Sequence, residues 1–423
     1  MAKKIRASIV LTTALIVCLT QWPARASETI LARTGTAAPA TIKSKVIKPK
    51  ITAQKKPSKK VLAKTGTTSA TKSKAVTRKK TRTIARRTPR RVRPAPVGKI
   101  PTYGVPSLDD DPSRDDPIVR AAAIEALGKL MGAVVVVNPE NGQILSIVNQ
   151  KLALESGYQP CSAFKPAVAL AALGDGIINS ETNRLKLGRK WYLTLEQALA
   201  KSNNLYFEEL GRSLGIERLQ YYGKLFGFGE AASFGINPES QGAFPEKAPS
   251  KGAGGVGKVA SFGQGISMTT LQLASFTSAM ANGGRLYYLQ YPTAGEEFVP
   301  MLKRELPISE TIDSVRKGME SAVLAGTARR ANIPDIHILG KTGTCSQDGA
   351  RLGWFAGYSD SPAKLAVVVL LRTGVKLGGG PKASEVAGRM FRKLGEGDYF
   401  ASLVQKTRTA RILPAAITFP SIQ

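Results

Sequence analysis

Apolar positions along this chain follow two different periods, which predict two kinds of element. Short runs rich in β-branched and aromatic residues predict strands, at residues 133–137, 143–149, 336–344, 352–358 and 364–371. Between these two groups of strands, apolar residues recur at helical spacing, which predicts helices at residues 162–173, 194–201, 205–214, 216–226 and 267–282. Two more helices are expected at residues 116–130 and 383–394.

This order of elements predicts an α+β fold. Strands at both ends with helices between them favour one antiparallel sheet that joins N- and C-terminal strands, flanked by helices and an all-helical subregion. The Asn138–Gly142 segment has the residues of a hairpin turn between the first two strands. Residues 228–262 lack a clear period, so we expect loops there.

The first 26 residues have the pattern of a secretory signal. Lys3, Lys4 and Arg6 precede an apolar run from Ala7 to Thr20, and Ala24–Ala26 offers a small-x-small cleavage site. The run is shorter than the roughly 20 residues that span a bilayer. We therefore expect residues 1–26 to be a signal peptide or an N-terminal anchor. The protein would then be extracytoplasmic, either periplasmic or attached to the outer face of the cytoplasmic membrane.

The formal net charge of +31 is concentrated near the N-terminus. Residues 27–100 contain 22 basic residues and a single acid, Glu28. A segment so poor in large apolar residues is expected to be a disordered linker. It could adhere to an anionic membrane or wall surface, whereas the lack of interleaved aromatic residues argues against nucleic acid. A folded domain is then expected over residues 101–423.

The residues available for catalysis are restricted. The only histidine, His337, lies in an alternating apolar segment and is interpreted as a structural strand residue. A metal site built from histidines is therefore excluded. None of the cysteines, Cys18, Cys161 and Cys345, belongs to a Cys-x-x-Cys pair, so a zinc or redox motif is unsupported.

A Ser-x-x-Lys pattern begins the helix predicted at residue 162. Residues three apart share one face of a helix, so Lys165 is expected beside Ser162. A serine is a weak nucleophile unless a base takes its proton, and burial lowers the pKa of a lysine toward the range that suits a base. The pattern alone has little specificity, because it fixes only two positions.

Two later patterns strengthen this interpretation. Ser202–Asn204 is Ser-x-Asn in a break between helices, where helix capping is the simpler explanation. Lys341–Thr344 is Lys-Thr-Gly-Thr at the end of a predicted strand. Gly343 would let a ligand lie close to the backbone, an exposed edge could pair with an extended substrate, and Lys341 would add positive potential.

Together the three patterns resemble the motif set of the penicillin-binding proteins and serine β-lactamases. The segments Phe262–Gly265 and Trp354–Tyr358 also resemble segments of that family. The resemblance covers roughly residues 130–395. It implies a peptidoglycan D,D-transpeptidase that acts through a serine acyl-enzyme on D-Ala-D-Ala stem peptides, is acylated by β-lactam antibiotics and needs no cofactor.

The resemblance also assigns roles to the motif residues. Ser162 would form the acyl-enzyme, with Lys165 as its general base. Ser202 would relay protons and Asn204 would orient the substrate amide. Lys341 and Thr342 would bind the carboxylate of the substrate or antibiotic, and the backbone N–H groups of Ser162 and Thr344 would form the oxyanion hole, with Gly343 leaving room for the ligand.

Two further features need an interpretation. Cys161 and Cys345 occupy positions that resemble a pair bridged in class A carbapenemases, so the resemblance predicts a disulfide between them. Residues 252–259 almost match a phosphate-binding loop, but Val259 replaces the required Ser or Thr and no strand precedes it. We interpret these residues as a flexible loop near the site.

Two other functions remain open from the sequence. The protein could be a D,D-carboxypeptidase or serine β-lactamase, although Glu208-Glu209-Leu210-Gly211 lacks the Glu-x-x-Leu-Asn pattern of class A β-lactamases. It could also be a non-catalytic, wall-adhering protein that only binds penicillin.

Overall fold

Five antiparallel strands form the central sheet, in the order β2-β1-β9-β8-β7. They are β1 (Gly132–Asn138), β2 (Gln143–Val148), β7 (Ile338–Gln347), β8 (Ala350–Ser359) and β9 (Ala366–Thr373). The N-terminal hairpin pairs with the C-terminal strands through β1 and β9. The predicted α+β class and the mixed origin of the sheet are therefore confirmed, and β7 lies at an edge of the sheet.

The computed structural model describes residues 100–360, 363–374 and 377–404. The expected signal segment 1–26 and nearly all of the basic linker 27–100 lie outside the described residues. Among the described residues, no helix has the length and apolar character needed to cross a membrane.

The sheet separates two apolar cores. Val135 and Val137 of β1 point into one core, whereas Val134 and Val136 point into the other, as expected when side chains alternate along a strand. Both faces are covered, which explains why β1 is a continuous apolar run rather than an alternating one.

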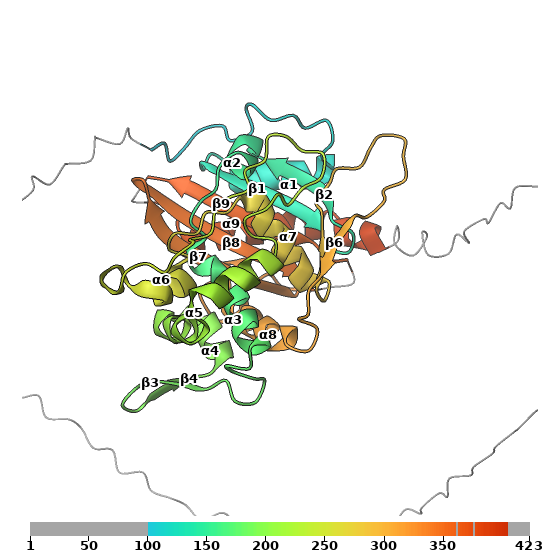
Figure 1. The fold of residues 1–423 in the computed structure, drawn as a ribbon. Coiled ribbons are helices and arrows are strands. Elements are labelled where there is room, and N and C mark those ends of the chain that lie inside the picture. Colours follow the sequence, from blue (N-terminus) through green and yellow to red (C-terminus); the bar gives the residue numbers. More distant parts are fainter. Residues whose placement is uncertain (1–99, 361–362, 375–376, 405–423) are drawn as a thin grey trace, which may run out of the picture. The chain divides into compact units, whose positions relative to one another are not determined.

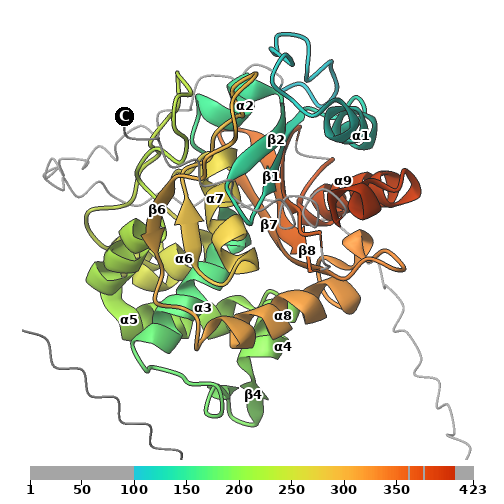
Figure 2. The same cartoon turned by 90° about the vertical axis from the view of Figure 1, so that its right-hand side faces the viewer.

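Helices cover both faces of the sheet (Figures 1 and 2). On one face pack α1 (Pro117–Leu127) and α9 (Gly380–Glu396). On the other face lie α7 (Thr270–Ala281) and a helical region that contains α3 (Lys165–Gly174), α4 (Leu195–Ala200), α5 (Asn204–Leu225), α6 (Gly255–Phe262) and α8 (Ile312–Leu324). The site described below lies where α3 and the start of α5 approach β7.

Smaller elements complete the described part of the chain. They are α2 (Gln150–Leu154), the hairpin of β3 (Leu185–Gly188) and β4 (Trp191–Leu193), the hairpin of β5 (Arg285–Tyr287) and β6 (Leu302–Glu305), and the 3-10 turns η1 (Cys161–Phe164), η2 (Lys251–Ala253) and η3 (Arg329–Ala331). The sequence pattern did not predict the two small hairpins or α2.

The expectation of loops throughout residues 228–262 was wrong at its end. The glycine-rich stretch that we interpreted as a flexible loop forms η2 and α6. Glycine disfavours helices, but tertiary packing decides here: α6 lies so close to α5 that a methyl group on Gly211 would come within 2.4 Å of the Ala260 Cβ atom. Conversely, the break predicted between residues 214 and 216 is confirmed, because Gly215 interrupts α5 with φ of 74°.

Candidate active site

Ser162 lies in η1, the short turn that leads into α3. The preceding residue, Cys161, has a backbone φ angle of 53°, which residues other than glycine rarely adopt. Such backbone strain tends to occur at functional sites, where the surrounding structure holds it in place. Ser162 is 8% exposed, and its hydroxyl makes no hydrogen bond within the described residues.

Lys165 is fully buried one helical turn beyond Ser162. Its Nζ atom donates hydrogen bonds of 2.7 Å to the backbone oxygen of Ser202 and 2.7 Å to Asn204 Oδ1, and it lies 3.3 Å from Ser202 Oγ. We expected Lys165 beside Ser162, but its hydrogen bonds go to the Ser-x-Asn motif. Two of the motifs are therefore joined directly through this amine.

The environment of Lys165 favours a neutral amine. Burial is the main cause that lowers the pKa of Lys165, to about 6, and the positive charge of Lys341 adds to it, whereas the carboxylate of Glu208 opposes it. A neutral amine has two N–H groups and one lone pair. The two short hydrogen bonds use the N–H groups, so the lone pair remains available to accept a proton.

The two asparagines of the Ser-x-Asn motif have different contacts: Asn203 caps a helix, and Asn204 bonds to Lys165. Asn203 caps α5, because its Oδ1 atom accepts a hydrogen bond of 2.9 Å from the N–H group of Tyr206. Asn204 is then free to contact Lys165. Ser202 has φ of 52° in the break between α4 and α5. The capping function that the sequence suggested thus belongs to Asn203 alone.

The edge strand β7 packs against the turn that contains Ser162. A methyl group built on Gly343 would lie 2.7 Å from the Pro160 carbonyl oxygen and 3.0 Å from the Ala163 nitrogen. Only glycine allows this approach, so the third motif is held against the first. Lys341 is fully buried, its Nζ atom donates a 2.9 Å hydrogen bond to the Thr342 carbonyl, and burial lowers its pKa to about 7.

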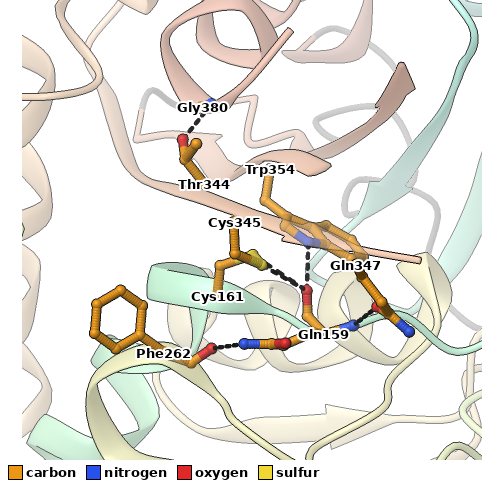
Figure 3. Close-up of a disulfide and its surroundings, with 8 residues drawn as sticks. All are labelled: Gln159, Cys161, Phe262, Thr344, Cys345, Gln347, Trp354 and Gly380. Carbon is orange, nitrogen blue, oxygen red and sulfur yellow. Dashed lines mark hydrogen bonds between the residues drawn. A yellow bond between two sulfur atoms is a disulfide. The ribbon is translucent and has the colours of Figure 1, made fainter. Parts of the chain in front are cut away.

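The two threonines of the third motif face away from Ser162. Thr342 Oγ1 donates a 2.7 Å hydrogen bond to Thr327 Oγ1, and Thr344 Oγ1 accepts a 2.6 Å hydrogen bond from the N–H group of Gly380. Figure 3 shows Thr344 turned toward Gly380. Because Thr344 accepts this bond, its own hydroxyl hydrogen is free to donate to a ligand.

The two sulfur atoms of Cys161 and Cys345 lie at bonding distance, and their Cα atoms are 5.7 Å apart (Figure 3). Gln159 holds the same region together through backbone and side chain. Its carbonyl accepts a 2.9 Å hydrogen bond from Trp354 Nε1, and its side-chain nitrogen donates a 2.8 Å bond to the carbonyl of Phe262. Strand β8 and α6 are thereby tied to the segment that precedes Ser162.

Sequence reasoning did not single out Gln159 or Thr327 as candidates for this site. It noted Glu208 only in a segment that lacks the Glu-x-x-Leu-Asn pattern, although this residue lies four positions after Asn204 and shares its face of α5. No pattern marks Gln159, and Thr327 lies in the segment Val323–Ala328, which resembles a segment of the family without indicating a role for the threonine. Their contacts connect segments that are far apart along the chain.

The remaining candidates lie outside the site. His337 immediately precedes β7, and its Nε2 atom lies 2.7 Å from Glu320 Oε1. It is about half exposed and takes no part in a serine-histidine pair. Throughout the described ranges, no group of three or more His, Cys, Asp and Glu side chains is placed to hold a metal ion.

The fold and the meeting of the three motifs define the class of the penicillin-binding proteins and serine β-lactamases. Within that class, residues 132–394 match the family model described as the penicillin binding protein transpeptidase domain. The chain belongs to this family.

Curated relatives agree with this assignment. Stage V sporulation protein D of Bacillus subtilis is 29% identical, over 61% of this chain and 48% of the relative. The peptidoglycan D,D-transpeptidase FtsI of Escherichia coli is 26% identical, over 57% of this chain and 46% of the relative. The chain therefore spans about half the length of the curated relatives it matches.

The structural comparison supports the fold. The transpeptidase domain of penicillin-binding protein 3 from Burkholderia pseudomallei superimposes with a TM-score of 0.56 at 22% identity, covering 72% of this chain and 96% of that chain. Penicillin-binding protein 2 from Pseudomonas aeruginosa gives a TM-score of 0.54 at 24% identity, covering 67% of this chain and 74% of that chain.

Proposed function

We propose that the protein is a peptidoglycan D,D-transpeptidase that forms an acyl-enzyme at Ser162. The observation that carries the proposal is the position of Lys165, a buried amine that touches Ser202 and Asn204 one helical turn from the serine. Membership of the transpeptidase domain family, and relatives named as D,D-transpeptidases, support the same reaction.

Acylation begins with proton transfer from Ser162 to the neutral amine of Lys165. The serine oxygen attacks the carbonyl carbon between the two D-alanines of a stem peptide, and the carbonyl oxygen becomes an oxyanion. The backbone N–H groups of Ser162 and Thr344 are the proposed donors to this oxygen. The carbon–nitrogen bond then breaks, and the departing amine of the terminal D-alanine takes up the proton.

Ser202 is the proposed carrier of that proton. Its hydroxyl lies 3.3 Å from Lys165 Nζ, so it can accept a proton from the lysine and pass its own to the leaving group. Deacylation reverses the path: an acceptor amine attacks the ester, loses a proton to the relay and leaves Ser162 as a free hydroxyl. Asn204 both positions Lys165 and orients the substrate amide.

Strand β7 binds the substrate in this proposal. As an edge strand it can pair with an extended stem peptide, and Gly343 leaves room for the peptide backbone. Thr344 contributes a hydroxyl for the terminal carboxylate, and Thr342 supports the same face of the strand through its hydrogen bond to Thr327. Lys341 acts through its charge, which lowers the pKa of Lys165.

Transpeptidation is favoured over hydrolysis by the contacts of Glu208. Rapid hydrolysis of an acyl-enzyme needs a base that activates water. Glu208, the acid nearest in sequence to Asn204, pairs with Lys258 at 3.0 Å and is not free for this task. Carboxypeptidase and β-lactamase activities therefore remain second to acyl transfer.

The proposal also covers the compartment in which the protein acts and the role of each part of the chain. Cys161 and Cys345 form a disulfide in an oxidising compartment, either the periplasm or the outer face of the cytoplasmic membrane. Residues 1–26 direct the chain there, residues 27–100 form a basic linker suited to an anionic membrane or wall surface, and residues 101–423 form the catalytic domain. β-Lactam antibiotics acylate Ser162 in place of stem peptides.

The experiment compares the wild-type protein with Ser162→Ala. A fluorescent penicillin should label the wild type covalently and leave the variant unlabelled. Labelling of the variant would contradict the role of Ser162, and a wild type that binds without a covalent adduct would indicate a non-catalytic penicillin-binding protein. With a stem peptide and an acceptor amine, a crosslinked product indicates transpeptidation, whereas release of D-alanine alone indicates a carboxypeptidase.

A further inference from the structure

The hairpin of β3 and β4 projects from the helical region, on the side away from the central sheet (Figures 1 and 2). It carries four exposed cations, which are Arg184, Lys186, Arg189 and Lys190. Glu181 is the one acid of residues 179–194. None of the four cations makes an ion pair within the described residues. The hairpin therefore presents positive charge that this part of the protein does not neutralise.

Two aromatic rings lie among these cations. Trp191 is 43% exposed and Tyr192 is 39% exposed, although such large rings are highly buried on average. Lys186 is the direct partner of Tyr192 in the hairpin, and the Arg184 guanidinium lies 4.8 Å from the centre of the Tyr192 ring. Rings with an apolar body and a polar tip suit a boundary between water and an apolar medium.

The base of the hairpin is fixed to the helical region. The hydroxyl of Tyr206 in α5 donates a 2.6 Å hydrogen bond to the carbonyl of Asn183, and Asn183 Oδ1 accepts a 3.2 Å bond from the N–H group of Leu195 in α4. Leu185 and Leu187 pack against the apolar core, so the residue between them points outward. The cations and rings are thus held on a firm support.

This combination fits the headgroup layer of an anionic membrane. Lysine and arginine are attracted to acidic lipid headgroups, and tryptophan and tyrosine are favoured at the level of the headgroups. A projecting hairpin can touch a flat bilayer before the rest of the domain does, whereas a site for a small ligand is usually concave. The signal-like first 26 residues would bring the protein to such a surface.

We propose that the β3–β4 hairpin is a membrane-contact site that places Arg189, Lys190 and Trp191 in the headgroup layer of an anionic bilayer. Only α4, about 9 Å long at 1.5 Å per residue, lies in the chain between the hairpin and the Ser-x-Asn motif. Contact through the hairpin would therefore hold the active site near the bilayer in one orientation. This inference goes beyond the proposed function and does not depend on the acyl acceptor.

The test follows the fluorescence of Trp191 in the full chain with Trp22→Phe, where the buried Trp354 is the only other tryptophan. Vesicles of phosphatidylglycerol and phosphatidylcholine should move the Trp191 emission to shorter wavelength, because the ring leaves water. Lipids with brominated chains should quench this emission. Vesicles of phosphatidylcholine alone should do neither, and added salt should weaken the response to the anionic vesicles.

The variant Arg189→Gln with Lys190→Gln tests the cations. The ratio of membrane-bound to free hairpin, measured from the Trp191 emission, should fall by about fivefold for each charge removed. The matched control is Arg389→Gln with Arg392→Gln, which removes the same charge from exposed positions of α9 on the opposite face of the sheet. The control should leave the ratio unchanged. Covalent labelling by penicillin should be the same in all variants, which checks that they fold.

The proposal would be overturned if neither kind of vesicle changed the Trp191 emission, or if neutral and anionic vesicles acted equally. An equal loss in the α9 control would overturn it as well, because the effect would then belong to net charge. A response to soluble acidic glycopeptides of peptidoglycan, without a response to vesicles, would assign the hairpin to a wall polymer instead. In each case, labelling of Ser162 by penicillin would leave the proposed function standing.

Discussion

The Nζ atom of Lys165 lies 2.7 Å from the Oδ1 atom of Asn204, which joins the first and second motifs by one hydrogen bond. Lys165, rather than Ser162, is therefore the residue of the first motif that contacts the second motif. Because the same amine also reaches Ser202, a single buried group can serve the serine that attacks and the serine that relays. The predictions below follow from its burial and its neighbours.

Glu208 should set the pH at which Lys165 becomes a base. Its negative charge raises the pKa of Lys165 against the effect of burial. Glu208→Gln should therefore lower that pKa and move the acid limb of the pH profile of acylation to lower pH. Glu209→Gln is the control, because Glu209 is the neighbouring residue but is exposed and pairs with Arg212. A limb that stays in place, or moves equally in both variants, would show that Glu208 has no such role.

Gly343→Ala should slow acylation without unfolding the protein. The added methyl group would meet backbone atoms of Pro160 and Ala163 at 2.7 and 3.0 Å, so β7 must move away from Ser162. Displacing an oxyanion donor typically costs about 10²- to 10³-fold in rate. Gly188→Ala is the control, because its methyl group would meet only Trp191 at an ordinary 3.7 Å. Acylation of Gly343→Ala at the wild-type rate would contradict this arrangement of β7.

The disulfide between Cys161 and Cys345 should stabilise both the fold and the site. It closes a loop with a sequence separation of 184, and such crosslinks typically contribute about 2–4 kcal/mol to the free energy of unfolding. Replacing both cysteines by serine should lower this free energy, measured by denaturant unfolding, and slow acylation, because Cys161 holds a strained backbone beside Ser162.

Cys18→Ser provides the control for this change and should alter neither property. Mass spectrometry of non-reduced peptides gives an independent check. Free thiols at both Cys161 and Cys345, or unfolding that does not respond to a reducing agent, would contradict the disulfide.

Much of the fold was predictable because local and tertiary preferences agree. The Thr194–Gln197 capping box fixes the start of α4, and both of its hydrogen bonds are present. The break near Gly215 followed from the same local rules. By contrast, α6 contradicts its glycine-rich composition, because its helix depends on packing against Gly211 of α5.

The sequence predicted which residues belong to the candidate site better than it predicted their contacts. The spacing of the three motifs made Ser162, Lys165 and Ser202 candidates, but it did not show that Lys165 bonds to the second motif. That contact, and the pairing of Thr342 with Thr327, depends on how distant segments meet. The sequence also could not show which way Lys341 points, because both faces of its strand are buried and no alternation marks them.

The pH dependence of acylation tests the central claim most directly. The claim is that buried Lys165, with its pKa lowered to about 6, is neutral near pH 7 and takes the proton of Ser162. A base is active when unprotonated, so the second-order rate constant for benzylpenicillin should rise from pH 5 to pH 7 with an inflection near the pKa of Lys165. A rate that is constant over this range, or that rises only where an ordinary lysine loses its proton, would contradict the account.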